Sequence, residues 1–347
     1  MVFNFSHGLS RNRHSVPIFY ALVWRSAQFT VSFGSNKHLT GLTIVKNRVA
    51  QSPEQYLDKT DKSTKRLNRI AVKQGKCIPQ TDKLIVEEPL AIWLRQQQPD
   101  TSVKEKHLFS TMRTPGGDRE LVLGMLLSEG VIDSVAQVRS LTFGEGTDSN
   151  ECYAELVPEL EVDWASQGRS ASFSSCGLCG KSAIRLLELR GVPKLDNTSR
   201  WLPEQVVVSL PDALKAQQDL FVQTGASHGC GLFDANGSLL SIAEDVGRHN
   251  ALDKLLGLRA RVPEYMEKGK VIGLSGRVSI EMMQKVVMSG VPVAVSVGAP
   301  TQLAVQMAQR FGITLIGFCQ QEGFNIYSGE QRLAFGSQPL KNNIKEK

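Results

Sequence analysis

The chain has 347 residues, enough for a sizeable hydrophobic core and two domains. Its formal charge of +6 is concentrated at the amino terminus: residues 1–76 hold 13 basic and 3 acidic side chains, and the remainder holds 27 and 31. A mildly acidic body lacks the clustered basic surface that is typical of nucleic-acid-binding domains. No apolar run approaches the roughly 20 residues of a membrane span. We therefore expect neither nucleic acid nor a membrane as a partner.

Residues 1–76 differ in composition from the rest of the chain. No acidic residue precedes Glu54, and the short apolar run at residues 16–24 is followed by a poor match to a signal-peptide cleavage site. An acid-poor, basic leader also fits an organelle transit peptide. We favour a third interpretation, an extension that stays disordered.

From Cys77 onward the pattern predicts an α/β protein in two parts. Residues 77–170 are expected to form a small α+β unit, with strands over 84–94, 107–112, 138–143 and 152–157 and a helix over 118–127. In residues 171–347, an Asn-Gly pair between apolar runs predicts a hairpin over 231–243. Helices and strands then alternate, as in a layered α/β domain. The expected helices cover 181–190, 211–221, 250–258, 280–288 and 301–310, and the expected strands cover 271–274, 293–297 and 314–318.

Two thiols, Cys176 and Cys179, lie three residues apart in the segment Ser-Ser-Cys-Gly-Leu-Cys-Gly-Lys, directly before a predicted amphipathic helix. The unpaired N–H groups and the dipole at a helix N-terminus favour a thiolate. Lys181 and Arg185 would act in the same direction. The pattern predicts an exposed, acidic nucleophilic thiol, and Cys176 is the candidate because the first thiol of such a pair is normally the more exposed.

Three other interpretations of the pair remain. Half of a zinc site would need two further ligands, but Cys77, Cys152, Cys230 and Cys319 are scattered singly. A thioredoxin-like redox pair would follow a strand of a βαβ unit, whereas a polar segment precedes this pair. A structural disulfide is disfavoured, because six cysteines in a chain of this length without a secretory signal indicate a reducing compartment, which we take to be the cytoplasm.

The cysteine segment resembles the signature loop of the FdhD family, the formate dehydrogenase accessory sulfurtransferases. Supporting phrases follow the family's order over about residues 80 to 336, at 86–90, 114–118, 123–130, 244–256, 275–279, 316–319 and 325–327. The resemblance implies a cytidine-deaminase-like core in the second part. It also implies that a cysteine desulfurase gives sulfane sulfur to Cys176, which carries it as a persulfide, and that the sulfur passes to the molybdenum bis-molybdopterin guanine dinucleotide of formate dehydrogenase. Cys179 would either release the sulfur or tune its neighbour.

The resemblance also implies a cofactor-binding segment just past the last parallel strand, where ligands of α/β sheets bind. Its residues are Cys319, Gln320, Gln321, Glu322, Gly323 and Phe324. Relatives usually carry a basic residue near position 323, so the glycine here predicts weaker binding of phosphate. We further expect a homodimer.

A second candidate site lies in the strand-to-helix corner that holds Asp245, Arg248 and His249. Such corners commonly bind phosphates and nucleotides. Arg248 would bind a phosphate and Asp245 the amide edge of a guanine, although an Asp-Arg pair that caps the helix fits equally well. His228 and His249 are candidates for proton transfer.

A zinc nucleobase deaminase is the rival from another class. That chemistry requires a His-x-Glu pair and a Pro-Cys-x-x-Cys motif. Neither His228 nor His249 has the glutamate two residues on, and Ser175 occupies the proline position. The alternatives kept are a dithiol oxidoreductase and a non-catalytic chaperone of the molybdenum cofactor.

Overall fold

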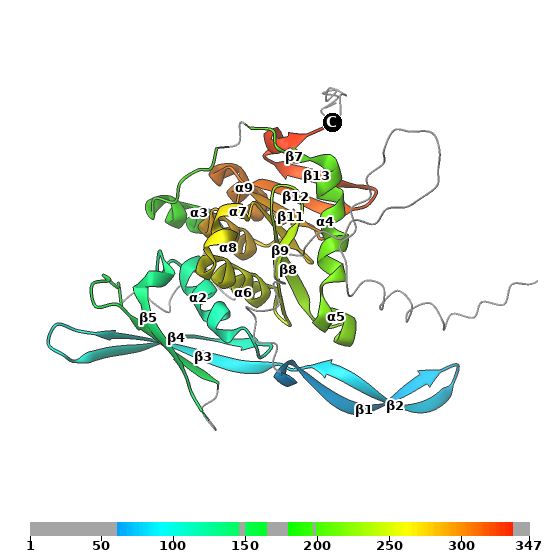
Figure 1. Cartoon of the computed structure of the whole chain (residues 1–347), viewed down its shortest axis with the longest axis horizontal. Helices are drawn as coiled ribbons and strands as arrows, with labels where there is room; N and C mark the ends of the chain where they lie inside the picture. The colour runs from blue at the N-terminus through cyan, green and yellow to red at the C-terminus, as the bar shows by residue number, and fades with distance from the viewer. Residues whose placement is uncertain (1–60, 146–149, 165–179, 197–198, 336–347) are drawn as a thin grey trace, which may run out of the picture. The chain divides into compact units, whose positions relative to one another are not determined.

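The computed structural model describes residues 61–145, 150–164, 180–196 and 199–335. Within these residues the protein is α/β, as predicted: a small sheet with its own helix precedes a larger sheet with helices on both faces (Figure 1). Among the described residues, no helix combines the length and the apolar character that crossing a bilayer requires.

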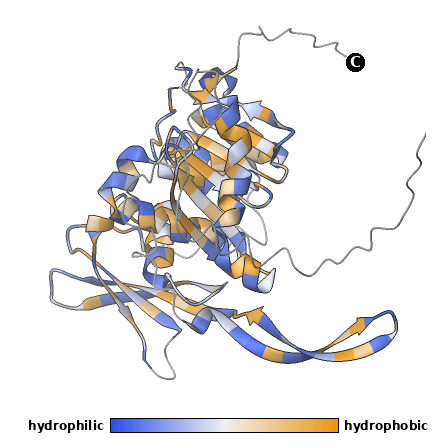
Figure 2. Ribbon diagram, turned by 45° about the vertical axis from the view of Figure 1, so that its right-hand side comes forward, coloured by the Kyte–Doolittle hydropathy of each residue, from blue (hydrophilic) through white to orange (hydrophobic). Residues whose placement is uncertain are grey.

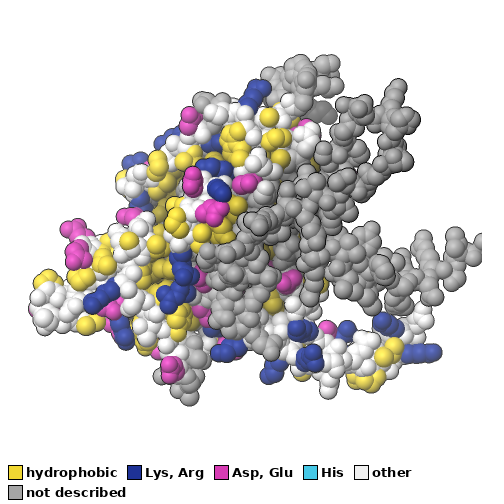
Figure 3. All heavy atoms as spheres, in the orientation of Figure 1, with side chains coloured by type: hydrophobic (Ala, Val, Ile, Leu, Met, Phe, Trp, Pro, Cys, Tyr) yellow, Lys and Arg dark blue, Asp and Glu magenta, His cyan; other side chains and the backbone are white. Residues whose placement is uncertain are grey.

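The described chain begins with a hairpin of two long strands, β1 (Thr64–Lys73) and β2 (Lys76–Ile85). Apolar side chains such as Leu67, Ile70 and Val72 are exposed on it, and Lys and Arg side chains gather along it on the face shown in Figure 3. The predicted boundary after residue 76 is therefore wrong, because it falls in this hairpin. Apolar residues on both faces of β1 hid the period-2 alternation that marks a half-buried strand.

The small sheet has the strand order β4-β3-β6-β5. Its strands are β3 (Glu88–Gln97), β4 (Val103–Arg113), β5 (Val138–Phe143) and β6 (Glu151–Leu156), and helix α2 (Asp118–Ser128) packs on it. The inward positions of β3 alternate strictly, with Leu90, Ile92 and Leu94 fully buried. The expected strand over 84–94 is in fact two strands, since the chain leaves β2 after Ile85 and enters β3 at Glu88.

The larger sheet has the order β13-β12-β11-β10-β8-β9, in which β10, β11 and β12 are parallel and the outer pairs are antiparallel. Its strands are β8 (His228–Phe233), β9 (Leu239–Asp245), β10 (Val271–Leu274), β11 (Val293–Ser296), β12 (Thr314–Gln320) and β13 (Gly323–Ser328). The three parallel strands are mostly apolar (Figure 2), and β10, β11 and the first four residues of β12 are buried, as expected for strands covered on both faces. The predicted hairpin is confirmed, with Gly237 at φ 82° in its turn.

Helices cover both faces of this sheet (Figure 1). One face is covered by α3 (Gly180–Leu189), α6 (Arg248–Arg261), α7 (Pro263–Lys268), α8 (Ile280–Ser289) and α9 (Gln302–Phe311). The other is covered by α4 (Glu204–Ala216) together with the short strands β7 (Leu202–Pro203) and β14 (Leu333–Ala334), and α5 (Asp219–Thr224) follows α4. The predicted helices over 181–190, 250–258, 280–288 and 301–310 are thus confirmed.

The predicted helix over 211–221 is wrong in its bounds. Proline is favoured in the first turn of a helix, but Pro211 lies inside α4, and the chain breaks again before α5. Tertiary packing outweighs the local preference, because Val207, Leu210 and Leu214 line the buried face of α4 on both sides of the proline.

Helices α2 and α6 cross at very short range, which joins the small sheet to the larger one. A Cβ at Gly257 would lie 1.9 Å from the carbonyl oxygen of Glu120, and a Cβ at Gly124 would lie 1.8 Å from that of Asp253. Neither approach is compatible with a side chain, so the glycine at each position sets how closely the two helices pack.

Candidate functional site

The two thiols of the predicted nucleophile, Cys176 and Cys179, lie outside the described residues. The helix that was expected to follow them is present, since α3 begins at Gly180, and Ala183 and Leu187 anchor it in the core. Arg185 is exposed and forms an ion pair with Glu188 at 3.3 Å. Along the described part of the chain, no three His, Cys, Asp or Glu side chains gather as a metal site would require.

The four described cysteines divide into one exposed and three buried thiols. Cys77 is exposed on β2, whereas Cys152, Cys230 and Cys319 are buried. Burial raises the pKa of the Cys152 thiol to about 12 and that of Cys319 to about 11, and it raises the pKa of Cys230 as well. Because the thiolate is the reactive form, the three buried thiols are unsuited to nucleophilic chemistry at neutral pH.

The predicted ligand-binding residues converge on one edge of the larger sheet. The parallel strands β10, β11 and β12 end there, at Leu274, Ser296 and Gln320. The end of β9 and the start of β8 meet at the same edge, because His228 pairs with Asp245 and Cys230 pairs with Leu274. Ligands of open α/β sheets bind outside the carboxyl ends of such strands.

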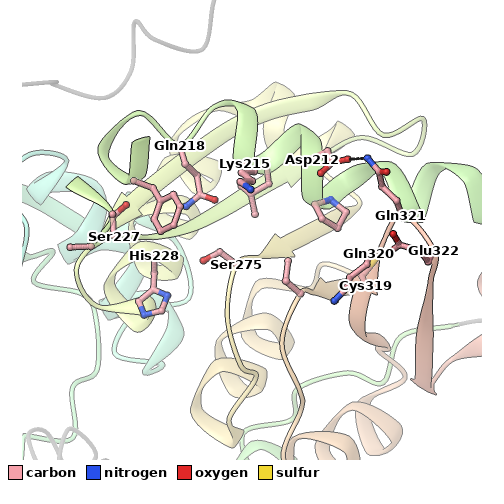
Figure 4. A pocket seen from close by; sticks show the side chains of 16 residues that line it. Asp212, Lys215, Gln218, Ser227, His228, Ser275, Cys319, Gln320, Gln321 and Glu322 are labelled. Atoms are coloured by element: carbon pink, nitrogen blue, oxygen red, sulfur yellow. Dashed lines mark hydrogen bonds between the residues drawn. The ribbon is translucent and has the colours of Figure 1, made fainter. Parts of the chain in front are cut away.

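A cavity of about 660 Å³ opens at this edge, between α4, α5 and the strand ends (Figure 4). Helix α4 and the link to α5 contribute one wall, and the opposite wall comes from the segments after β10, β11 and β12. The described residues that line it are Pro211, Asp212, Leu214, Lys215, Gln218, Phe221, Gly225, Ala226, Ser227, His228, Ser275, Val297, Cys319, Gln320, Gln321 and Glu322.

Four of the six residues of the predicted cofactor segment line this cavity: Cys319, Gln320, Gln321 and Glu322. The segment is a tight connection between two antiparallel strands rather than an open loop, since Gln320 pairs with Gly323. Gly323 has φ 151° and open space around its missing Cβ. Gly323 and Phe324 belong to β13 and are absent from the described lining.

The Cys319 thiol donates to a carbonyl oxygen of α4 that lacks its usual helical partner. Pro211 has no N–H to donate to the carbonyl oxygen of Val207, four residues earlier in α4. The Cys319 thiol donates to that oxygen instead, at 3.3 Å. Cys319 therefore joins the sheet edge to α4, and its raised pKa fits this structural role.

The buried carboxylate of Asp245 has hydrogen-bond and ion-pair partners within the protein. Its oxygens accept from the backbone N–H groups of Thr114 at 3.0 Å and Gly247 at 2.8 Å, and from the Asn250 amide at 3.3 Å. Its ion-pair partner is Lys254, at 2.7 Å, rather than the expected Arg248. The Asp-Arg pair, one of the two interpretations that the sequence left open, is thus replaced by a buried Asp-Lys pair. Asp245 ties the end of the small sheet to the corner before α6.

His228, Arg248 and His249 lie near the same edge of the sheet, at the start of β8 and of α6. His228 lines the cavity, whereas Arg248 and His249 are absent from its described lining. Burial lowers the pKa of both histidines, that of His249 to about 4, and the positive charge of Arg248 acts in the same direction. The Arg248 Nε is buried and has no hydrogen-bond partner among the described residues. At neutral pH both imidazoles are therefore uncharged.

Comparison with known proteins places the chain in a family. The model of the FdhD/NarQ family matches residues 85–334. The chain belongs to the FdhD/NarQ family. It is 38% identical over 280 residues to the sulfur carrier protein FdhD of Streptomyces avermitilis, covering 78% of this chain and 96% of that protein. It is 40% identical over 261 residues to the sulfur carrier protein FdhD of Nocardia farcinica, and this match covers 74% of this chain and 90% of that protein.

A solved structure shares the fold of this FdhD/NarQ chain. It belongs to a Desulfotalea psychrophila protein that is provisionally described as a formate dehydrogenase accessory protein. The TM-score is 0.57 at 23% identity, and the match covers 78% of this chain and 99% of the other. The family resemblance noted in the sequence is confirmed by the family model and by the two relatives.

The sequence did not point to the α4 wall of the cavity. Asp212, Lys215 and Gln218 recur at three-residue spacing, which places them along one side of a helix and its continuation. The sequence predicts a helix that begins at Pro211 and assigns no role to this row of side chains. Once α4 is extended back to Glu204, its apolar face turns to the sheet and the polar row turns to the cavity.

Proposed function

We propose that the chain is a cytoplasmic sulfur carrier for the maturation of formate dehydrogenase. It accepts sulfane sulfur from a cysteine desulfurase as a persulfide on Cys176 and transfers that sulfur to the molybdenum bis-molybdopterin guanine dinucleotide. The relatives that bear the name sulfur carrier protein FdhD are matched over nearly their full length, which supports this role. A homodimer and contact with formate dehydrogenase belong to the same proposal.

The distribution of the described thiols supports the assignment of the carrier to the pair Cys176 and Cys179. A sulfur carrier needs a thiol that is accessible and partly ionised at neutral pH. Cys152, Cys230 and Cys319 fail both conditions. Only Cys77 is exposed among the described cysteines, and it lies outside the segment matched by the family model. Cys176 and Cys179, which lie within that segment, are left as the carrier pair.

The transfer conserves electrons at each step. The Cys176 thiolate attacks the outer sulfur of the donor persulfide, a sulfur–sulfur bond forms at Cys176, and the donor leaves as a thiolate. In the second transfer, either a nucleophilic group of the acceptor attacks the outer sulfur and Cys176 leaves as a thiolate, or Cys179 attacks the inner sulfur. Attack by Cys179 would release the outer sulfur as hydrosulfide and leave a disulfide, which a thiol reductant must then reduce.

The cavity at the sheet edge is the proposed site for the guanine nucleotide part of the substrate. Its volume of about 660 Å³ lies within the range of small-molecule pockets. Its position outside the parallel strand ends, and the four predicted residues that line it, support the proposal.

Activity of formate dehydrogenase in cells that lack their own carrier tests the function. The unaltered chain should restore formate-dependent dye reduction, and Cys176→Ala should not, although its thermal unfolding should match that of the parent. The matched control is Cys77→Ala, which removes the exposed thiol of β2 and should restore activity fully. Full activity of Cys176→Ala would contradict the assignment.

A further inference from the structure

The cavity has chemically different ends. Asp212, Lys215 and Gln218 follow one another along the α4 wall at three-residue spacing. Asp212 and Lys215 lie within α4, and Gln218 lies in the link between α4 and α5. Figure 4 shows Asp212 beside Gln321, Glu322 and Gln320 at one end, and Gln218 beside Ser227 and His228 at the other.

The Asp212 end is acidic and is held in place by one hydrogen bond. The Gln321 amide donates to Oδ2 of Asp212, which ties the β12–β13 connection to α4. The second carboxylate oxygen of Asp212 has no hydrogen-bond or ion-pair partner among the described residues. Glu322 adds another negative charge to this end of the lining. A phosphate would be repelled here, whereas a group rich in N–H donors would be attracted.

Lys215 lies between the two ends and is not committed to any described partner. It is exposed, lines the cavity, and forms no ion pair with Asp212 although the two are three residues apart on one helix. Its ammonium group is therefore available to a negatively charged part of a ligand. Since Cys319 and His228 are uncharged at neutral pH, Lys215 is the cation that the described lining offers.

Gln218 adds a second polar group to the lining of the cavity. The residue is only 4% exposed, it lines the cavity, and its side-chain amide has no hydrogen bond to any described residue. The amide packs against Gly229, where a Cβ would lie 2.6 Å from it. The amide can therefore hydrogen-bond to a polar group of a ligand in the cavity.

We propose that Asp212 is the residue that selects guanine, with the base at the Asp212–Gln321 end and the sugar and phosphates directed toward Lys215 and Gln218. This inference rests on the proposed function, in which the substrate carries guanine nucleotides. A guanine presents two adjacent donors, the N1–H and the N2 amino group, to a carboxylate. Adenine presents an acceptor at N1, which would face the Asp212 carboxylate with its lone pair, so adenine is rejected.

Exchanging the base tests the assignment. In Asp212→Asn, the side-chain oxygen can still accept from Gln321, and the new NH2 group faces the cavity. Xanthosine diphosphate carries an oxygen where guanine carries the N2 amino group. This oxygen can accept a hydrogen bond from the new NH2 group, whereas GDP loses the hydrogen bond from its amino group to the carboxylate. Calorimetric titration should show GDP binding weakened roughly ten- to a hundredfold in Asp212→Asn. The ratio of the dissociation constants for GDP and xanthosine diphosphate should shift toward xanthosine diphosphate.

Two further variants separate base recognition from other effects. Asp133→Asn alters an exposed aspartate outside the described lining and should bind GDP like the parent. Lys215→Met should weaken GDP and xanthosine diphosphate by the same factor, because attraction to phosphate does not depend on the base. A change of base preference in Lys215→Met would overturn the proposed orientation.

Different results would refute the role of Asp212 and the guanine nucleotide site itself. If the parent binds GDP and Asp212→Asn binds it with unchanged affinity and preference, the role of Asp212 is refuted while the nucleotide site stands. If the parent binds GDP and ADP equally, or binds neither, the guanine nucleotide site itself is refuted.

Discussion

Replacement of Asp245 distinguishes a structural carboxylate from a ligand-binding one. Asp245 is fully buried, and its ion pair with Lys254 is also buried, with side-chain exposures of 0% and 3%. Asp245→Ala removes the charge partner of Lys254 and leaves the backbone N–H groups of Thr114 and Gly247 without their acceptor. Breaking a buried pair by removing one partner costs about 3 to 5 kcal/mol, because the remaining charge stays buried and uncompensated.

We therefore expect Asp245→Ala to lower the free energy of unfolding by about 3 to 5 kcal/mol. The assay is urea unfolding followed by circular dichroism, with the slope of the transition checked for a change of the unfolded state. The double variant Asp245→Ala/Lys254→Met should recover part of the loss, because it also removes the uncompensated ammonium group. The surface control is Asp82→Ala, which breaks the exposed pair with Arg69 and should cost less than about 1 kcal/mol.

A loss below about 1 kcal/mol in Asp245→Ala, together with loss of thermal protection by GDP, would refute this reasoning. It would mean that Asp245 contacts the nucleotide, as the sequence suggested, and that the buried network is not what holds the corner before α6.

Three further predictions follow from the packing and the titrating groups. Gly257→Ala should lower the free energy of unfolding by several kcal/mol, because the new Cβ would lie 1.9 Å from the Glu120 carbonyl oxygen and force α2 and α6 apart. Faster hydrogen exchange of the amides of α2 would show this change. The pKa of His249 is lowered from 6.5 to about 4, so only the unfolded chain takes up this proton in that interval. The contribution of neutral His249 to the free energy of unfolding is therefore complete above pH 6.5 and is lost as the pH falls toward 4. His249→Gln should flatten this part of the plot of unfolding free energy against pH. Under native conditions a thiol reagent should label Cys77 rapidly and Cys319 only after unfolding, since Cys319 is buried with its thiol bonded to α4.

The sequence predicted the regular part of the larger sheet well because each element repeats a strong pattern. The run 271–274 matched β10 without error, and the Asn-Gly turn identified the β8–β9 hairpin. Prediction from the sequence failed where tertiary contacts outweigh a local preference. Pro211 sits inside α4 because the apolar residues around it bury against the sheet. Strand β1 escaped detection because its apolar residues occupy both faces of an exposed hairpin.

The candidate site was predictable only in part. The segment at Cys319 was placed correctly at the ends of the parallel strands, since strand order follows from the alternation of elements. The partners across the cavity were not predictable, because Asp212 meets Gln321 over a separation of 109 residues and no local pattern encodes that contact. For the same reason the sequence offered the nearby Arg248 as one possible partner of Asp245, whereas the buried partner is Lys254, six residues further along α6.

The most direct test of the sulfur-carrier account is mass spectrometry of the chain after incubation with a cysteine desulfurase and cysteine. The account predicts one added sulfur atom on the peptide that contains Cys176, reversible by thiol reductants, and none on that peptide in Cys176→Ala. The peptides that contain Cys77, Cys152, Cys230 and Cys319 serve as internal controls and should remain unchanged. Absence of sulfur from Cys176, or its appearance on Cys77 instead, would contradict the account.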